Sequence, residues 1–549
     1  MKKVLRLITL LFLVHLYMPS SACTSFLVGK NASACGSTFI TYSADSYGMY
    51  GKLIYLPAEK YAQGALRRIV DGDTNKFMGY IPEANETFAV MGNINEYQVA
   101  ITETTFGGRP ELVDSTGVID YVSLMALGLQ RAKTAREAIK VMTDLVEKYG
   151  YASEGESFSI ADPNEVWILE MIGKGNVEKG AVWVAVRIPD DCIAAHANHS
   201  RIHQFLQYKK EDVMYAKDVI SFARKQGYFN GKDADFSFSS TYAPEDFSAL
   251  RYCEARVWSF YNKWTDGMNE FVKYASGTEP GKHRPMPLFI KPNRPLSLQD
   301  VKDSMRDHYE GTPFDVTKDV GAGVYCAPYR PSPLTWKYNG KNYFNERPIS
   351  TQQAAFTVVA QMRSTLPNPI GGILWYGNDD PNMIAYTPIY CNSRSVPACY
   401  NAIDANDHTF SWVSAFWVCN WVSNMVYPRY SQLFPEVKAL QMRLEKEYAT
   451  SQPQIEKEAL ELYSLGKHEE AIMLLDKYGQ CCAQNMLQEW KKLGERIIVK
   501  YNDQVVKIEK DGKYELTPDG LIVPPHRPGF DEHQREYIIS ETKDKFLVP

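Results

Sequence analysis

Cys23 stands where a hydrophobic N-terminal segment ends, and this position favours an unusual chemistry. Residues 1–22 begin with three basic residues, continue with an apolar run and end in Pro-Ser-Ser-Ala, which is typical of a secretory signal peptide. Cleavage after Ala22 would make Cys23 the first residue, with a free α-amine. A thiol with a pKa of about 8.5 needs a base, and an α-amine with a pKa of about 7.7 to 8.0 on the same α-carbon can accept its proton. Cys23 can then act as a nucleophile without a histidine.

The same position allows two other interpretations. Bacterial lipoproteins are acylated on a cysteine directly after the signal peptide, which would tether the protein and block the amine. That motif prefers a leucine-like residue at the third position before the cysteine, where this chain has Ser20. A cysteine without any role is the third interpretation, and the leader alone leaves all three open.

Short motifs after Cys23 favour the nucleophile. They are CTSFLVGK (23–30), DS (45–46), NE (95–96), ITETT (101–105), VWVAVR (182–187), PDD (189–191), ANHSRI (197–202), RVW (256–258), HYEGTPFD (308–315) and SAFW (414–417). Their types and order resemble the cysteine dipeptidase family, which are N-terminal-nucleophile hydrolases related to penicillin V acylases and bile salt hydrolases. The resemblance covers most of residues 23–430 and is therefore more specific than any single motif.

The resemblance implies a role for four residues. Cys23 is the nucleophile with its α-amine as the base, and the Asp45 carboxylate orients that amine. Asn198 donates a hydrogen bond to the oxyanion of the tetrahedral intermediate. Arg256 matches an active-site arginine that comes late in the chain, and Arg251 is close enough in sequence to compete with it.

Two nearby features have no assigned role. Tyr42 stands three residues before Asp45, where relatives usually have an arginine, so the positive charge expected beside the thiol is missing. Residues 103–105 lie on a predicted strand that could line the pocket, and no function is assigned to them.

The spacing of apolar residues predicts an α+β fold. Period-two patterns separated by Gly- and Asn-rich turns predict strands over 26–42 and again over 158–197, with connections too short for parallel crossovers. These segments therefore indicate antiparallel sheets. The resemblance implies a four-layer αββα sandwich, in which two antiparallel sheets are stacked between helical layers.

Helices are predicted between and after these strands. Residues 120–132 and 134–149 form a helical pair, in which Thr134 and Glu137 have capping-box spacing and Gly150 supplies the stop. The expected domains are a signal peptide at 1–22, a hydrolase domain at 23–432 and a mainly helical C-terminal extension at 433–549. The extension is predicted to contain a helix over 436–480 interrupted near 451–453, and a second helix over 483–501.

Composition and charge exclude several classes of protein. The 549 residues are 45% hydrophobic and 23% charged, which is globular, and the net charge of −5 comes without a basic stripe, so nucleic acid is not an expected partner. Residues 409–428 are uncharged over about the length of a membrane span. Because Asn420 and Asn424 would be costly in a bilayer, we expect buried core and no stable membrane insertion.

Metal and cofactor motifs are absent from the sequence, so no cofactor and no metal are expected. The sequence contains no His-Glu-x-x-His, no Gly-x-Ser-x-Gly and no glycine-rich phosphate loop. A strand would point His196 and His199 to opposite faces, while His203 is farther along the chain. Cys391 and Cys399 flank a turn-like segment and could form a disulfide.

The function expected from these observations is that of a secreted, cofactor-free dipeptidase, located in the periplasm or outside the cell. A dipeptide is attacked by Cys23, and a thioester forms and is hydrolysed. Two alternatives remain. One is a hydrolase of N-acyl amides on the same fold, and the other is a lipid-anchored peptide-binding protein without catalysis.

Overall fold

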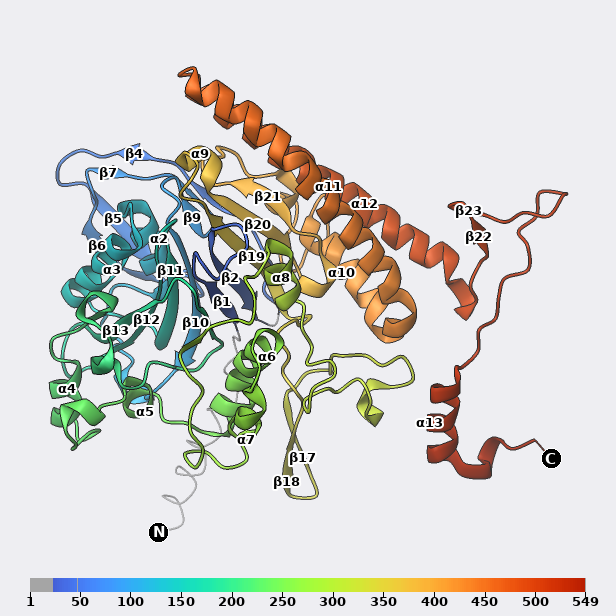
Figure 1. Cartoon of the computed structure of the whole chain (residues 1–549), viewed down its shortest axis with the longest axis horizontal. Coiled ribbons are helices and arrows are strands. Elements are labelled where there is room, and N and C mark those ends of the chain that lie inside the picture. The colour runs from blue at the N-terminus through green and yellow to red at the C-terminus, as the bar shows by residue number, and fades with distance from the viewer. Residues whose placement is uncertain (1–22, 47, 549) are drawn as a thin grey trace, which may run out of the picture.

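The computed structural model describes residues 23–46 and 48–548 (Figure 1). The predicted signal peptide lies outside the described residues. The described part combines α-helices with antiparallel sheets and has a mainly helical C-terminal region, which confirms the α+β prediction.

One sheet has seven strands, all paired antiparallel with their neighbours. Their order is β16 (Phe289–Ile290), β14 (Ile193–His196), β1 (Ser25–Val28), β2 (Thr38–Asp45), β19 (Ala354–Met362), β20 (Ile373–Asn378) and β21 (Thr387–Tyr390). The predicted strand–loop–strand at 26–42 is the β1–β2 pair, in which Leu27 lies opposite Ile40. Cys23 therefore comes two residues before a central strand of this sheet.

The second sheet has eight strands. Their order is β15 (Val213–Tyr215), β13 (Ala181–Ile188), β12 (Val166–Gly173), β11 (Gly155–Ala161), β10 (Ala100–Gly107), β9 (Ile94–Asn95), β8 (Val90–Met91) and β3 (Tyr55–Leu56). The strands β11, β12 and β13 form the predicted meander. The prediction was wrong for its last strand, because residues 193–196 leave this sheet and pair with β1, where His196 lies opposite Ser25.

Alternate residues of β12 belong to two different apolar clusters, because successive side chains of a strand point to opposite faces. Trp167, Leu169 and Met171 pack with the residues of α2 and α3, whereas Ile168 and Ile172 pack with those of β1 and β2. Polar contacts also join the two sheets. Thr102 Oγ1 donates to Thr41 O at 3.1 Å, and both ring nitrogens of His196 lie 2.7 Å from hydroxyls of the eight-stranded sheet.

The predicted helical pair is confirmed, and its ends follow the expected capping residues. It comprises α2 (Tyr121–Arg131) and α3 (Ala135–Tyr149). The Asp120 side chain accepts from Ser123 N, and the Thr134 hydroxyl accepts from Glu137 N. Gly150 follows α3 with a φ of 82°, a left-handed conformation that glycine adopts without strain.

The C-terminal region begins with α10 (Ala415–Val426), α11 (Tyr430–Ser464) and α12 (His468–Lys500), and Figure 1 shows the last two as long, neighbouring helices. The predicted interruption near 451–453 was wrong. Pro453 lies inside α11, and the chain turns at Gly466 instead, where φ is 76°. The helix predicted over 483–501 is the second half of α12. The proposed boundary at residue 433 falls in the first turn of α11 and stays a prediction.

Helix α12 packs directly against the seven-stranded sheet. A Cβ atom at Gly479 would lie 2.8 Å from Pro388 O of β21, so the close approach requires glycine there. The segment 409–428 contributes one buried face of α10, as expected, although Phe410, Trp412 and Val413 before the helix are exposed. Within the described residues, no helix has the length and apolar character needed to cross a membrane.

The remaining α-helices and strands are mostly short or peripheral, apart from the buried helix α6. They are β4 (Glu59–Lys60), β5 (Leu66–Val70), β6 (Phe77–Pro82), β7 (Glu86–Thr87), α4 (Val219–Lys225), α5 (Phe238–Tyr242), α6 (Ala255–Trp264), α7 (Val272–Ala275), α8 (Leu298–Ser304), β17 (Thr335–Tyr338), β18 (Lys341–Phe344), α9 (Asn368–Gly371), β22 (Glu509–Lys510), β23 (Lys513–Tyr514) and α13 (Glu532–Thr542). All ten cysteines are free thiols. The disulfide considered for Cys391 and Cys399 is absent, since Cys391 Sγ faces Asn368 O and Cys399 Sγ faces Ala483 O.

An ion pair between Arg306 and Glu445 joins the main body to α11, and both side chains are buried. Replacing Glu445 by Gln is expected to lower the free energy of unfolding by about 3 to 5 kcal/mol, because Arg306 would stay buried without its counter-charge. Urea unfolding measures this change. The control is Glu447→Gln on the same helix, whose pair with Arg443 is exposed, with an expected change of about 0.5 kcal/mol or less. Similar losses in both variants would contradict the expectation.

Candidate active site

The main chain of Cys23 is held on both sides by residues from distant parts of the sequence. Cys23 N donates to Asn198 Oδ1 at 2.8 Å, and Cys23 O accepts from Arg256 Nη1 at 2.5 Å. The Cys23 side chain itself is buried, with 5% of the residue exposed. The position of the sulfur is thus set by the β1 main chain and by these two partners.

Arg256 lies at the start of α6 and is fully buried. Besides Cys23 O, its guanidinium donates to Thr24 Oγ1 at 2.7 Å, Ala197 O at 2.9 Å and Asn198 Oδ1 at 3.0 Å. It therefore holds the main chain around Cys23, and none of these hydrogen bonds involves the sulfur. Arg251, the other arginine considered for this role, forms an ion pair with Glu346 instead.

Asn198 lies in the turn after β14, where its φ of 66° is left-handed, a conformation that asparagine tolerates better than most residues. Its Nδ2 donates to Thr105 O of β10 at 2.8 Å, while its Oδ1 accepts from Cys23 N. Glu170 stabilises the following loop by accepting from Arg201 N and Ile202 N. Asn198 is thereby fixed between the two sheets.

Asp45 ends β2 and is 1% exposed. Its carboxylate accepts from Ser43 Oγ and forms a buried ion pair with Arg347. Burial raises the pKa of Asp45 to about 6, although the Arg347 charge opposes this rise. In the full-length chain, the hydrogen bond of Cys23 N goes to Asn198, and the hydrogen bonds of the described residues include none from Cys23 N to the Asp45 carboxylate.

Tyr42 and Glu103 lie on the other side of the sulfur. Cys23 Sγ is 3.8 Å from the Tyr42 hydroxyl and 3.7 Å from Glu103 Oε1, and that hydroxyl donates to the same carboxylate oxygen. Burial, Glu103 and Asp45 together raise the pKa of the Cys23 thiol well above its usual value. The thiol is therefore protonated at neutral pH in this environment, and its activation needs a base.

Sequence reasoning placed four residues in the site, and the structure brings Cys23, Asp45, Asn198 and Arg256 together. It missed Arg347, which supplies a positive charge beside Asp45 although Tyr42 replaces the expected arginine. No local pattern marks Arg347, which is 302 residues away from Asp45 in sequence. The sequence did contain a sign of Glu103, because this carboxylate stands in the otherwise uncharged segment AITETTFG.

The three histidines considered for a metal site have separate partners. His196 contacts Thr104 and Ser159, and burial lowers its pKa to about 3, so its ring is neutral. His199 faces Glu254, and His203 faces Ser237. Over residues 23–46 and 48–548, no group of three or more His, Cys, Asp or Glu side chains is arranged to hold a metal ion.

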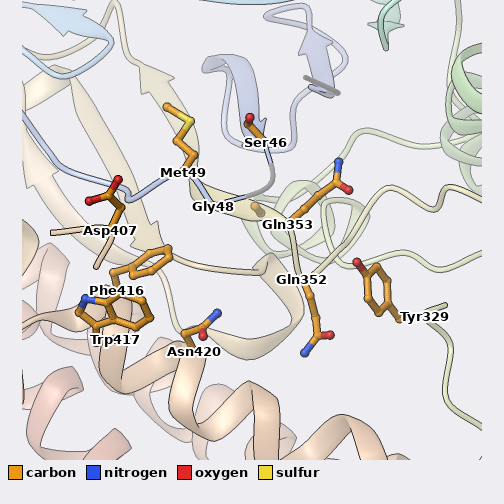
Figure 2. A pocket seen from close by; sticks show the side chains of 11 residues that line it. Ser46, Gly48, Met49, Tyr329, Gln352, Gln353, Asp407, Phe416, Trp417 and Asn420 are labelled. Carbon is orange, nitrogen blue, oxygen red and sulfur yellow. The ribbon is translucent and has the colours of Figure 1, made fainter. Parts of the chain in front are cut away.

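A cavity of about 300 Å³ begins at Ser46, directly after Asp45. Ser46 N donates to Gln353 O at 3.0 Å, and both residues line the cavity. Figure 2 shows Phe416, Trp417 and Asn420 projecting from α10 on one side, with Ser46 and Met49 opposite. A cavity of this volume is at the lower end of the range for small-molecule sites.

Comparison with known proteins shows the family to which the chain belongs. The profile of Peptidase family C69 matches residues 22–53 and 51–443, a range that includes all the residues of this candidate site. The chain is 26% identical to a "Probable dipeptidase" of Salmonella dublin over 393 residues, covering 68% of this chain and 82% of that protein. It is 25% identical to "Dipeptidase A" of Lactobacillus helveticus over 404 residues, covering 70% and 78% of the two chains. The resemblance found in the sequence is confirmed: this chain belongs to Peptidase family C69, a family of cysteine peptidases.

Proposed function

We propose that this chain is exported, is cleaved after Ala22 and hydrolyses dipeptides with the Cys23 thiol as the nucleophile. The family and the dipeptidase names of its relatives support this activity. The observation that carries the proposal is the environment of Cys23. A buried thiol lies at the predicted cleavage site, with its main chain held by Asn198 and Arg256.

Cleavage would turn the Cys23 nitrogen into the base that the thiol needs. Before cleavage this nitrogen is a peptide N–H, whose lone pair is delocalised into the carbonyl group and therefore does not accept a proton. As an α-amine it takes the thiol proton while sulfur forms a bond to the substrate carbonyl carbon. The resulting oxyanion collapses, the C–N bond breaks, and the ammonium returns that proton to the leaving amine. A thioester on Cys23 remains.

Water completes the cycle by the same route. It gives a proton to the α-amine as its oxygen attacks the thioester carbon, the S–C bond breaks, and the thiolate recovers the proton. The negative charges of Asp45 and Glu103 disfavour a free thiolate. The proton therefore leaves the thiol as the bond to carbon forms, which is general-base catalysis.

Asn198 is the proposed oxyanion donor. Its amide group carries two hydrogens, of which one is given to Thr105 O. The second is available to the oxyanion, a kind of contact that contributes about 2.7 to 4 kcal/mol in other enzymes. The Asp45 carboxylate is the proposed partner of the charged α-ammonium, which gains two more N–H donors when the peptide bond to Ala22 is cut.

We also propose the finer fold class and the location. A four-layer αββα sandwich is supported by the two antiparallel sheets, by their shared apolar cluster, and by helices that pack on each outer face. Export to the periplasm or the cell exterior is supported by the leader alone. A lipid anchor on Cys23 would block both the thiol and the amine.

Replacing Cys23 by Ala is expected to lower kcat/KM for dipeptides at least about 1,000-fold, because the nucleophile is lost. Hydrolysis of a dipeptide panel by the purified mature protein measures it. Cys35→Ala, which removes an exposed thiol, is the control and should keep wild-type activity. Full activity of the Cys23→Ala protein would contradict the proposed mechanism.

Intact mass of the protein purified from its native host tests the cleavage. We expect a chain that begins at unmodified Cys23, because both the thiol and the amine must be free. A diacylglycerol adduct on sulfur would support the lipid-anchored peptide-binding protein instead.

Rates for N-acyl amino acids, measured beside those for dipeptides, distinguish the dipeptidase from the acylase.

The pH profile tests the ion pair of Asp45. With a pKa of about 6, Asp45 is ionised at neutral pH, so kcat/KM should fall as the pH drops through about 6. Arg347→Met removes the charge that lowers this pKa, so the acid limb should move to higher pH. Arg347→Lys keeps the charge and should restore most of the profile. Arg251→Met, which breaks a neighbouring ion pair, should leave the limb in place, and an unmoved limb in Arg347→Met would contradict this role.

A further inference from the structure

Glu103 is a buried carboxylate beside the nucleophile without a cationic partner. It is 1% exposed, and its Oε1 lies 3.7 Å from Cys23 Sγ. No Lys, Arg or His forms an ion pair with it among residues 23–46 and 48–548. The two arginines of the site are bound elsewhere, since Arg347 pairs with Asp45 and Arg256 holds the main chain of Cys23.

The neighbouring Glu156 stabilises this arrangement without cancelling the charge. Burial and the charge of Glu103 raise the pKa of Glu156 well above its usual value, so Glu156 carries a proton. Thr105 Oγ1 donates to Glu156 Oε1 at 2.6 Å, whereas the Oε2 atoms of both glutamates are buried and lack a donor. A proton on Glu156, donated to Glu103, satisfies both oxygens. Burial raises the pKa of Glu103 above its usual value, and hydrogen bonds from two neutral donors, Tyr42 and Glu156, oppose this rise. In this arrangement Glu103 holds the one negative charge of the glutamate pair.

The geometry of a dipeptide places a cation at this position. In its first residue, the ammonium nitrogen and the carbonyl carbon are both bonded to the α-carbon and lie about 2.5 Å apart. When Cys23 Sγ attacks that carbonyl carbon, the ammonium comes within a few ångströms of the sulfur. A carboxylate oxygen 3.7 Å from the sulfur is within reach of it.

We propose that Glu103 binds the α-ammonium group of the substrate's first residue and thereby selects substrates with a free N-terminus. This inference rests on the proposed hydrolysis by Cys23 and names the substrate class of that site. An N-acyl amide has carbon where the dipeptide has its ammonium, so it would bury Glu103 without a counter-charge, which is costly. A dipeptide instead forms a charge-assisted hydrogen bond.

Tyr42 positions the carboxylate without cancelling its charge. Its hydroxyl donates to Glu103 Oε1, and a neutral hydroxyl leaves the negative charge of Glu103 available to a cationic group of the substrate.

The test compares two substrates that differ only in the amine. One is the fastest-cleaved member of an Xaa-Ala dipeptide panel, and the other is its desamino analogue. Glu103→Gln should lower kcat/KM for the dipeptide about 100-fold and change kcat/KM for the analogue about threefold or less. The ratio of the first value to the second therefore falls steeply. Glu103→Asp keeps the charge and should retain part of the selectivity. Glu178→Gln, which removes a carboxylate paired with Lys225 at the surface, should keep the wild-type ratio.

Each outcome separates this inference from the proposed function. Equal losses on both substrates would mean that Glu103 acts on the thiol or on the fold, which overturns the inference. An unchanged ratio, or wild-type protein that cleaves both substrates equally, overturns it too, while dependence on Cys23 would stand. Alkylation of Cys23 by iodoacetamide, followed by intact mass, shows whether each variant keeps a reactive site. Should Glu103→Gln fail to fold, the ratio of kcat/KM for the two substrates in Glu103→Asp decides. A ratio of about one, with no preference for the dipeptide over its analogue, overturns the inference.

Discussion

The main chain of Cys23 is clamped between Asn198 and Arg256, and the geometry of the site depends on this clamp. One partner accepts from the Cys23 nitrogen and the other donates to its carbonyl oxygen, across 175 and 233 residues of sequence. Asn198 reaches the site because β14 leaves the meander and pairs with β1. Its amide also donates to Thr105 O of the eight-stranded sheet, so both sheets define the position of Cys23.

The two carboxylates near the Cys23 sulfur, Asp45 and Glu103, differ in their partners. Asp45 has a buried arginine as its partner, whereas the donors to the Glu103 carboxylate within the described part of the chain are neutral. Burying a carboxylate without a counter-charge is expensive, and such a cost persists where the charge has a function. The same carboxylates raise the pKa of the thiol, which explains why the proposed base must act during the attack and why a preformed thiolate is disfavoured.

An element was predicted correctly where its signal lies in neighbouring residues, and was misplaced where it depends on distant ones. The caps of α2 and α3 were predictable, because Asp120, Thr134 and Gly150 act on main-chain atoms within a few residues. The break in the C-terminal helices was misplaced, because Pro453 is accommodated inside α11 and the turn forms at Gly466. The strand at 193–196 was assigned to the wrong sheet, because its period-two pattern does not specify its partner.

By itself, the sequence indicated the α+β class, predicted Cys23 as the nucleophile and named most of the residues that surround it. Each of these has a signature in neighbouring residues: a cysteine at a predicted cleavage site, apolar periodicity, or motifs in a fixed order. Only the tertiary structure decided which charges meet. Arg347 lies 302 residues from Asp45, and Glu103 lies 80 residues from Cys23. Such pairs leave no local pattern, because chain folding brings them together and burial then strengthens their interaction.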